Sequence, residues 1–424
     1  MPSVPETARH RLRIRLAFLT LFAALGLAAC WWTPLRGLNY GSAGDPYRRA
    51  NLPEIPRRKD QPVFRVVLAG DGGLAIRDDD PTLALLGEWS DEFPGRTVVV
   101  YLGDNVYPAG LQKGDKQAEG ILLRQMRATR APKIFVPGNH DWGYTGTQQL
   151  TPGVLGNQQA FIEAHAEGRA EFMPKDGCPG PSEIELLPPG KSLAGGLTVV
   201  ALDLHWWLLP QEERPKCAGI DDTNAFLKRF GEMLAAHRGR NVLVVAHHPI
   251  LSGGPHGDQS RGFWMDLGVT LAYPFYRSQD LFQPGYQEMV RLLEAPMAKD
   301  PPLAMIGGHD HSLQVLEGGN VARVVIVSGA ASRVSGVTSV GGTLFAHAHL
   351  GFVVMDFYRL EGGTEETVLV RVVETGRGKD PVFTLAIDLK EEDAPVQPIP
   401  DPKSGTGQSR AIPQREDRTL SPPP

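Results

Sequence analysis

Metal-binding side chains follow five short apolar runs in this sequence. They are Asp71, Asp104, Asn139, His247, His309 and His311. Carboxylate, amide and imidazole groups are common ligands of iron, zinc and manganese. Two cations held about 3.5–4 Å apart can clamp the attacking and leaving oxygens of a displacement at phosphorus. Because two cations repel each other, they need an anionic bridge, and the Asp104 carboxylate is the natural candidate.

The apolar run before each of these side chains is typical of a buried β-strand. The runs cover residues 64–69, 97–102, 133–136, 241–246 and 303–306. Helical patterns at residues 82–89 and 117–129 separate the first three runs, which predicts a β-α-β-α-β unit. Open α/β sheets bind ligands beyond the carboxyl ends of their strands. The sequence therefore predicts a single metal centre at one edge of a sheet.

The rest of the chain carries weaker structural signals. Helices are expected at residues 157–166, 221–237 and 285–295, the second with Asp221 as its N-cap, and a strand at 197–202. Glycine and proline are frequent at residues 143–195, which we expect to form a surface insertion. Beyond His311, β-branched residues mark strands that suggest a second sheet packed on the first. These strands are expected at residues 321–327, 343–356 and 367–373.

The five segments resemble the motifs of the calcineurin-like metallophosphoesterases, in the same order. They read Gly-Asp-Gly-Gly (70–73), Gly-Asp-Asn-Val-Tyr (103–107), Gly-Asn-His-Asp (138–141), Val-Val-Ala-His (244–247) and Gly-His-Asp-His (308–311). The tyrosine three residues after Asp104 gives an Asp-x-x-Tyr motif that resembles that of the purple acid phosphatase branch. Within this branch, the sequence most resembles the small mammalian-type (tartrate-resistant acid phosphatase-like) enzymes. The resemblance covers roughly residues 63–357. It implies an α/β fold, a four-layer α/β/β/α sandwich of two mixed sheets flanked by helices.

The resemblance also implies a role for each site residue. The ligands of a ferric ion would be Asp71, Asp104, Tyr107 and His311. The ligands of a divalent iron, zinc or manganese ion would be Asp104, Asn139, His247 and His309. The catalytic residues that face the substrate would be His140 and His256. Three neighbours, Asp141, His248 and Asp310, are expected to orient other groups rather than to bind metal.

Tyr107 distinguishes between two kinds of metal pair. A phenol has a pKa of about 10, so it binds as phenolate at neutral pH only to a strong Lewis acid such as Fe(III). The alternative is a Mn/Mn or Zn/Zn pair, with Tyr107 as a packed aromatic side chain.

The implied activity is that of a phosphomonoesterase, in which a hydroxide bound to two metal ions attacks a phosphate ester. Its substrate would be a phosphorylated small molecule or a phosphopeptide. One alternative is a phosphodiesterase of the same superfamily that acts on nucleotides or envelope phosphodiesters. A rival from another class is a non-catalytic metal-binding surface lipoprotein, against which the complete ligand set and His140 argue. The net charge of −5 gives no reason to expect a nucleic-acid partner.

The N-terminus reads as a targeting segment. Arginines precede an apolar run at residues 16–29, which is too short to span a membrane comfortably. Small residues then precede Cys30, as in a bacterial lipoprotein processing site, so we expect a lipid on Cys30 and a place in the bacterial cell envelope. Trp31 in place of an aspartate favours the outer membrane, facing the periplasm. The alternatives are an uncleaved anchor, or an ordinary signal peptide followed by a chance cysteine.

The sequence divides into four parts on this interpretation. They are a lipoprotein signal peptide (1–29), a flexible tether (30–62), a metallophosphoesterase catalytic domain (63–390) and a disordered tail (391–424). With Cys30 acylated, Cys178 and Cys217 remain as an even pair in an oxidising compartment, which predicts a disulfide. Two buried thiols are the alternative.

Overall fold

The computed structural model describes residues 45–53, 55, 60–75, 77–143, 153–190, 192–257, 279–359 and 365–389. The predicted signal peptide, Cys30 and the predicted tail lie outside the described residues. Part of the predicted tether lies within the described residues. There Tyr47–Arg48 forms a strand that pairs with Thr343–His347 at a sheet edge, so the tether prediction is wrong for these residues. None of the helices in the described ranges has the length and hydropathy that crossing a membrane requires.

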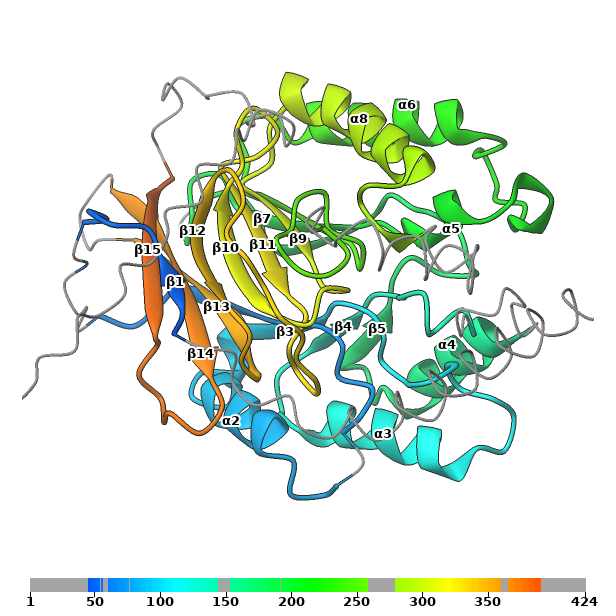
Figure 1. Cartoon of the computed structure of the whole chain (residues 1–424), viewed down its shortest axis with the longest axis horizontal. Coiled ribbons are helices and arrows are strands. Elements are labelled where there is room, and N and C mark those ends of the chain that lie inside the picture. Colours follow the sequence, from blue (N-terminus) through cyan, green and yellow to red (C-terminus); the bar gives the residue numbers. More distant parts are fainter. Residues whose placement is uncertain are drawn as a thin grey trace, which may run out of the picture.

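In the part of the chain that the structure describes, fifteen strands form two mixed sheets that lie face to face (Figure 1). In chain order they are β1 (Tyr47–Arg48), β2 (Phe64–Ala69), β3 (Thr97–Tyr101), β4 (Lys133–Phe135), β5 (Ala170–Phe172), β6 (Ser182–Leu187), β7 (Leu197–Ala201), β8 (Val242–Val245), β9 (Ala304–Gly307), β10 (Leu313–Glu317), β11 (Val324–Ser328), β12 (Thr343–His347), β13 (Gly351–Arg359), β14 (Glu366–Glu374) and β15 (Phe383–Asp388). The eight-stranded sheet has the order β1-β12-β10-β11-β9-β8-β7-β6. The seven-stranded sheet has the order β15-β14-β13-β2-β3-β4-β5.

Helices cover the outer faces of both sheets (Figure 1). They are α2 (Pro81–Ser90), α3 (Lys116–Arg127), α4 (Val154–His165), α5 (His205–Leu208), α6 (Thr223–Ala236) and α8 (Pro284–Lys299), with short 3₁₀ turns η1 (Pro94–Arg96) and η2 (Gln211–Glu213). Helices α2 and α3 pack on the seven-stranded sheet, and α6 and α8 pack on the eight-stranded sheet. The predicted four-layer α/β/β/α sandwich is therefore confirmed.

The central strands are buried on both faces, which explains their mainly apolar runs. The charged residue of β2, Arg65, is buried in an ion pair with Asp356. In β2, Val66 and Leu68 point into the layer between the sheets. Val67 and Ala69 point the other way, toward α2 and α3. All four are at most 1% exposed, so the run can contain no polar residue without burying it.

Three details differ from the sequence prediction. Residues 343–356 break at 348–350 into β12 and β13, which belong to different sheets, so the late strands do not form a second sheet of their own. Residues 143–195, predicted as a surface insertion, form part of the sandwich itself, because they contribute α4 and the edge strands β5 and β6. Helix α6 is capped by Asp222 rather than Asp221, since the Asp222 carboxylate reaches the free N–H of the first turn.

The predicted disulfide is confirmed. Cys178 and Cys217 are bonded across a sequence separation of 39 residues. The bond joins the loop after β5 to the loop after η2, and Gly177 beside it lies against the ring of Trp142. The disulfide thus supports the segment that directly follows Asn139 and His140.

Candidate metal centre

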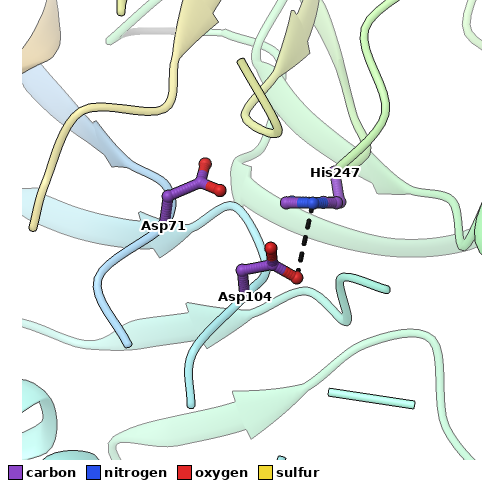
Figure 2. Close-up of side chains that lie close together, drawn as sticks. All are labelled: Asp71, Asp104 and His247. Carbon is purple, nitrogen blue, oxygen red and sulfur yellow. Dashed lines mark ion pairs between the residues drawn. The ribbon is translucent and has the colours of Figure 1, made fainter. Parts of the chain in front are cut away.

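The metal centre lies where the carboxyl ends of strands from both sheets meet. Asp71 and Asp104 follow β2 and β3 of the seven-stranded sheet, and His247 follows β8 of the eight-stranded sheet. Each of these three buried side chains offers one ligand atom, and the three atoms lie within 4.8 Å of one another (Figure 2). The Asp104 carboxylate is 3.4 Å from Nε2 of His247. The cluster is a candidate metal site.

Glycines let the loops that carry these side chains approach one another closely. A Cβ atom on Gly138 would lie 2.3 Å from Oδ1 of Asp104, and one on Gly308 would lie 2.8 Å from Oδ2 of Asp71. Asp104 itself has a φ of 51°, in the left-handed region that few non-glycine residues adopt. The close approach explains why a glycine precedes Asn139 and His309.

Asn139 and His309 complete a group around Asp104 and His247. Oδ1 of Asn139 is 3.1 Å from Nε2 of His247 and 3.1 Å from Nδ1 of His309. The two imidazole nitrogens are 3.2 Å apart. Nε2 of His309 donates to the backbone oxygen of Gln279, 3.0 Å away, so Nδ1 of this imidazole presents a lone pair toward the Asn139 oxygen. The predicted ligand set of the divalent ion is therefore gathered at one point.

Tyr107 and His311 form a second group with Asp71. The Tyr107 hydroxyl donates to Oδ1 of Asp71 at 2.9 Å and lies 3.2 Å from Nε2 of His311. That Nε2 is 3.4 Å from Oδ1 of Asp71. The two groups adjoin through Asp71 and Asp104, so the predicted ligand sets of both ions meet in one centre.

The two predicted catalytic histidines lie at the partly exposed rim of this centre. The backbone N–H of His140 donates to Oδ1 of Asp104 at 2.9 Å, and its side chain is 25% exposed. The ring of His256 lies over that of His309, with centroids 4.1 Å apart, and its side chain is 18% exposed. Both imidazoles are placed where a substrate could reach them.

The electrostatics of the buried cluster favour a bound cation. Burial opposes ionisation of Asp104, but His247 and His140 beside it hold the pKa of this carboxyl well below its usual range. Burial likewise opposes a charge on His247, yet the Asp104 carboxylate outweighs it and raises the pKa of His247 to about 10. A metal ion would supply the positive charge that a proton on His247 otherwise provides. The residues present therefore fit a metal site.

The pKa of Tyr107 is raised well above its ordinary value by burial and by the carboxylates of Asp104 and Asp71. The nearby Arg333 guanidinium acts in the opposite direction. A phenolate at this position would consequently require a strongly charged cation beside it.

Three residues next to the proposed ligands, Asp141, His248 and Asp310, hydrogen-bond to groups around the centre. Asp141 is fully buried and accepts from the backbone N–H groups of Asn105 and Gly138, at 2.9 and 2.8 Å. Asp310 accepts from the Ser252 hydroxyl and from the backbone N–H of His256. Nε2 of His248 lies 2.6 Å from the Gln279 side-chain oxygen. That these three residues support their neighbours rather than bind metal stays a prediction.

Sequence reasoning missed several residues around the centre. Asp203 follows β7, accepts from the Trp142 indole at 2.8 Å, and has its pKa raised to about 7 by burial. The sequence did contain a signal for Asp203, because an aspartate two residues after an apolar strand repeats the pattern of Asp71. Asp280 and Gln279, which reach His256 and His309, gave no such signal, since neither directly follows an apolar run in the sequence. Arg333 likewise follows β11 without a recognisable motif.

Comparison with solved structures shows what kind of fold this is. The chain is similar to GAP50, the anchor in the inner membrane complex of Plasmodium, with a TM-score of 0.51 and 16% identity over 77% of this chain and 89% of that chain. This likeness shows a shared fold. Weaker similarities include purple acid phosphatase PPD1 from yellow lupin (Lupinus luteus) seeds, with a TM-score of 0.47 and 14% identity over 78% of this chain and 55% of that chain. Another is the calcineurin-like phosphoesterase YfkN from Bacillus subtilis, with a TM-score of 0.32 and 12% identity over 77% and 90%. No family model and no curated protein matches the sequence.

The buried Asp141 generates a prediction about metal affinity. In Asp141→Asn the side chain loses one of the two acceptor oxygens that hold the loops of Asp104 and Asn139 together. We expect metal affinity to fall by about 10- to 100-fold, as for other groups that orient ligands, while the fold is kept. The measurement is a competition titration with a chromophoric chelator. An exposed aspartate, Asp221→Asn, is the control, and unchanged affinity in Asp141→Asn would contradict this role.

Proposed function

We propose that this protein is a metal-dependent phosphoesterase of the calcineurin-like superfamily, and specifically a phosphomonoesterase of the purple acid phosphatase type. The observation that carries the proposal is the meeting of seven donor side chains, from loops of both sheets, in one buried centre. Two partly exposed histidines, His140 and His256, lie at its rim. The order of the five motifs, which resembles that superfamily, supports the same function.

We propose that the centre holds two metal ions. The ligands of the first, a ferric ion, would be Asp71, Asp104, Tyr107 and His311. The ligands of the second, a divalent iron, zinc or manganese ion, would be Asp104, Asn139, His247 and His309. When bound, the ions would polarise the phosphoryl group, lower the pKa of a water molecule and balance the charge that develops during the reaction. A Mn/Mn or Zn/Zn pair is the alternative that the same donors permit.

A hydrogen bond fixes Nδ1 of each rim histidine. Nδ1 of His140 donates to the carbonyl oxygen of Pro108, because a carbonyl can only accept. Nδ1 of His256 faces the Asp280 carboxylate at 2.6 Å and donates to it. Nε2 is therefore the atom through which the His140 imidazole can exchange a proton. A protonated Nε2 near the leaving oxygen would supply the proton that departure of an alkoxide requires.

We also propose where the enzyme works and on what. The charged and then apolar N-terminus, followed by Cys30, supports a lipid anchor on the outer membrane with the catalytic domain in the periplasm. Phosphorylated small molecules or phosphopeptides are the proposed substrates.

The experiment that tests the function compares an aryl phosphate monoester with the corresponding bis-aryl ester. We expect faster turnover of the monoester by the purified protein, and none by Asp104→Ala, which should lose metal and activity together. Asp221→Ala serves as the matched control. Preference for the bis-ester would make the protein a phosphodiesterase, and metal binding without turnover of either ester would make it a non-catalytic metal-binding lipoprotein.

His140→Ala separates proton donation from metal binding. We expect unchanged metal content, because no side-chain atom of His140 belongs to either proposed ligand set. Turnover should fall by about 10²- to 10⁴-fold for alkyl esters, whose leaving groups need a proton, and by less for nitrophenyl esters. The measurement is kcat across a series of leaving groups. Loss of metal, or an equal loss for every leaving group, would contradict the assignment.

Tyr107→Phe tests the identity of the first ion. If the ion is ferric and bound to the phenolate, the wild-type protein absorbs visible light through a phenolate-to-iron transition, and the variant does not. We expect this band in the purified protein, together with iron by elemental analysis. A colourless protein that contains manganese or zinc would contradict the ferric assignment and place Tyr107 among the packed aromatic residues.

A further inference from the structure

Arg333 lies beside the metal centre without belonging to it. It follows β11, which runs parallel to β9 and so ends at the same edge as His309. The preceding residue, Ser332, donates its hydroxyl to the backbone oxygen of Asp71, which fixes this loop against the centre. The guanidinium carbon of Arg333 is 5.5 Å from the centroid of the Tyr107 ring.

The charge of Arg333 is not balanced within the described ranges. Several other arginines of the fold are paired with carboxylates, such as Arg65 with Asp356 and Arg238 with Asp300. Arg333 is exposed, contacts the ring of Tyr107, adds to burial in lowering the pKa of the nearby His311 through its charge, and makes no hydrogen bond or ion pair with another described residue. A cation–π contact at an exposed site is weak and occupies no hydrogen-bond donor. The five N–H donors of the guanidinium thus remain available to a ligand.

The position of Arg333 indicates which part of a ligand it would meet. The hydroxyl of Tyr107 points to Asp71 and His311, among the proposed metal ligands, whereas the Arg333 guanidinium lies beside the ring. Arg333 is exposed, whereas Asp71 and Asp104 of the proposed ligand sets are buried, so Arg333 lies on the solvent side of the centre. The leaving group of an ester bound in the buried centre would extend toward that side.

An exposed apolar side chain accompanies this cation. Leu74, in the loop after Asp71, is 43% exposed, one of two large apolar side chains exposed to that degree among the described residues. Its backbone N–H donates to the Ser332 hydroxyl at 3.2 Å, so Leu74 and Arg333 are held to the same short loop. Exposed apolar surface on the loops around a site can contact the carbon skeleton of a ligand whose anionic substituent a guanidinium binds.

We propose that Arg333 binds a second anionic group on the leaving-group side of the substrate, so that the enzyme prefers phosphate esters whose leaving group itself carries a carboxylate or a phosphate. The planar fork of a guanidinium matches the oxygens of both groups. The inference rests on the proposed phosphoesterase function and adds a substrate class to it.

The test compares three aryl phosphates that share one ring and differ at one position, which carries an uncharged amide, a carboxylate or a phosphonate. In Arg333→Gln we expect KM for the two anionic substrates to rise about tenfold, with kcat within twofold and the amide substrate unchanged. Arg333→Lys should recover part of the loss, because it restores the charge without the fork. Arg127→Gln, an exposed arginine of α3, is the matched control and should alter none of the three.

Two further measurements separate this inference from its alternatives. Metal content in Arg333→Gln should equal that of the wild type; a loss would mean that Arg333 supports Tyr107 and would overturn the proposal. In a non-hydrolysable analogue of each substrate, a phosphonate replaces the phosphate that would be transferred. Calorimetric titration of the wild-type protein should show that the two analogues with an anionic ring substituent bind about tenfold more tightly than the amide analogue. Selectivity should decline as salt is raised, since an exposed charge contact is screened.

The remaining outcomes would count against the proposal or against the function on which it rests. An equal rise of KM for all three substrates in Arg333→Gln would place Arg333 on the transferred phosphoryl group and overturn the proposal. Unchanged KM for all three would show that Arg333 does not contact substrate. If the wild-type protein turns over none of the three, the phosphoesterase function itself fails, and the titrations alone then decide whether Arg333 binds a second anion.

Discussion

The structure depends on the burial of two carboxylates, Asp71 and Asp104, at a point where they need a positive charge. Removing a carboxylate from water is costly unless hydrogen bonds and an opposite charge replace the solvent. Neutral groups supply some of the hydrogen bonds: the backbone N–H of His309 donates to Asp71, and that of His140 donates to Asp104. The charge must come from His247 or from a metal ion, and the surrounding amide, phenol and imidazole donors suit the ion.

This constraint explains why the centre lies between two sheets rather than at the edge of one. The proposed oxygen ligands Asp71, Asp104 and Asn139 come from the seven-stranded sheet, and the proposed imidazole ligands His247 and His309 come from the eight-stranded sheet. Nδ1 of His247 also bonds the backbone oxygen of Leu102, 2.8 Å away, across the junction. A change in how the sheets pack would therefore separate the two kinds of ligand, so the apolar layer between them serves the site as well as stability.

The sequence indicated which side chains gather at the candidate site more precisely than how the late strands pair, because the signals for those side chains are local. An apolar run, a glycine and a donor fit within about ten residues, and each of the seven predicted donors lies in the centre. Sheet membership is decided by strand partners far apart in sequence, which is why residues 343–356 were placed in one sheet although they supply two. Arg333 and Asp280 were missed for the same reason: each reaches the centre from a loop whose own sequence carries no motif, and only the folded chain brings it there.

The account stands on the claim that side chains of both sheets hold a pair of metal ions bridged by Asp104. Anomalous diffraction from crystals of the metal-loaded protein, together with elemental analysis of the same crystals, measures this directly. The account predicts two peaks in each chain, one next to Tyr107 and His311 and the other next to Asn139 and His309, with the Asp104 carboxylate between them. A single peak, or none at these side chains, would contradict it.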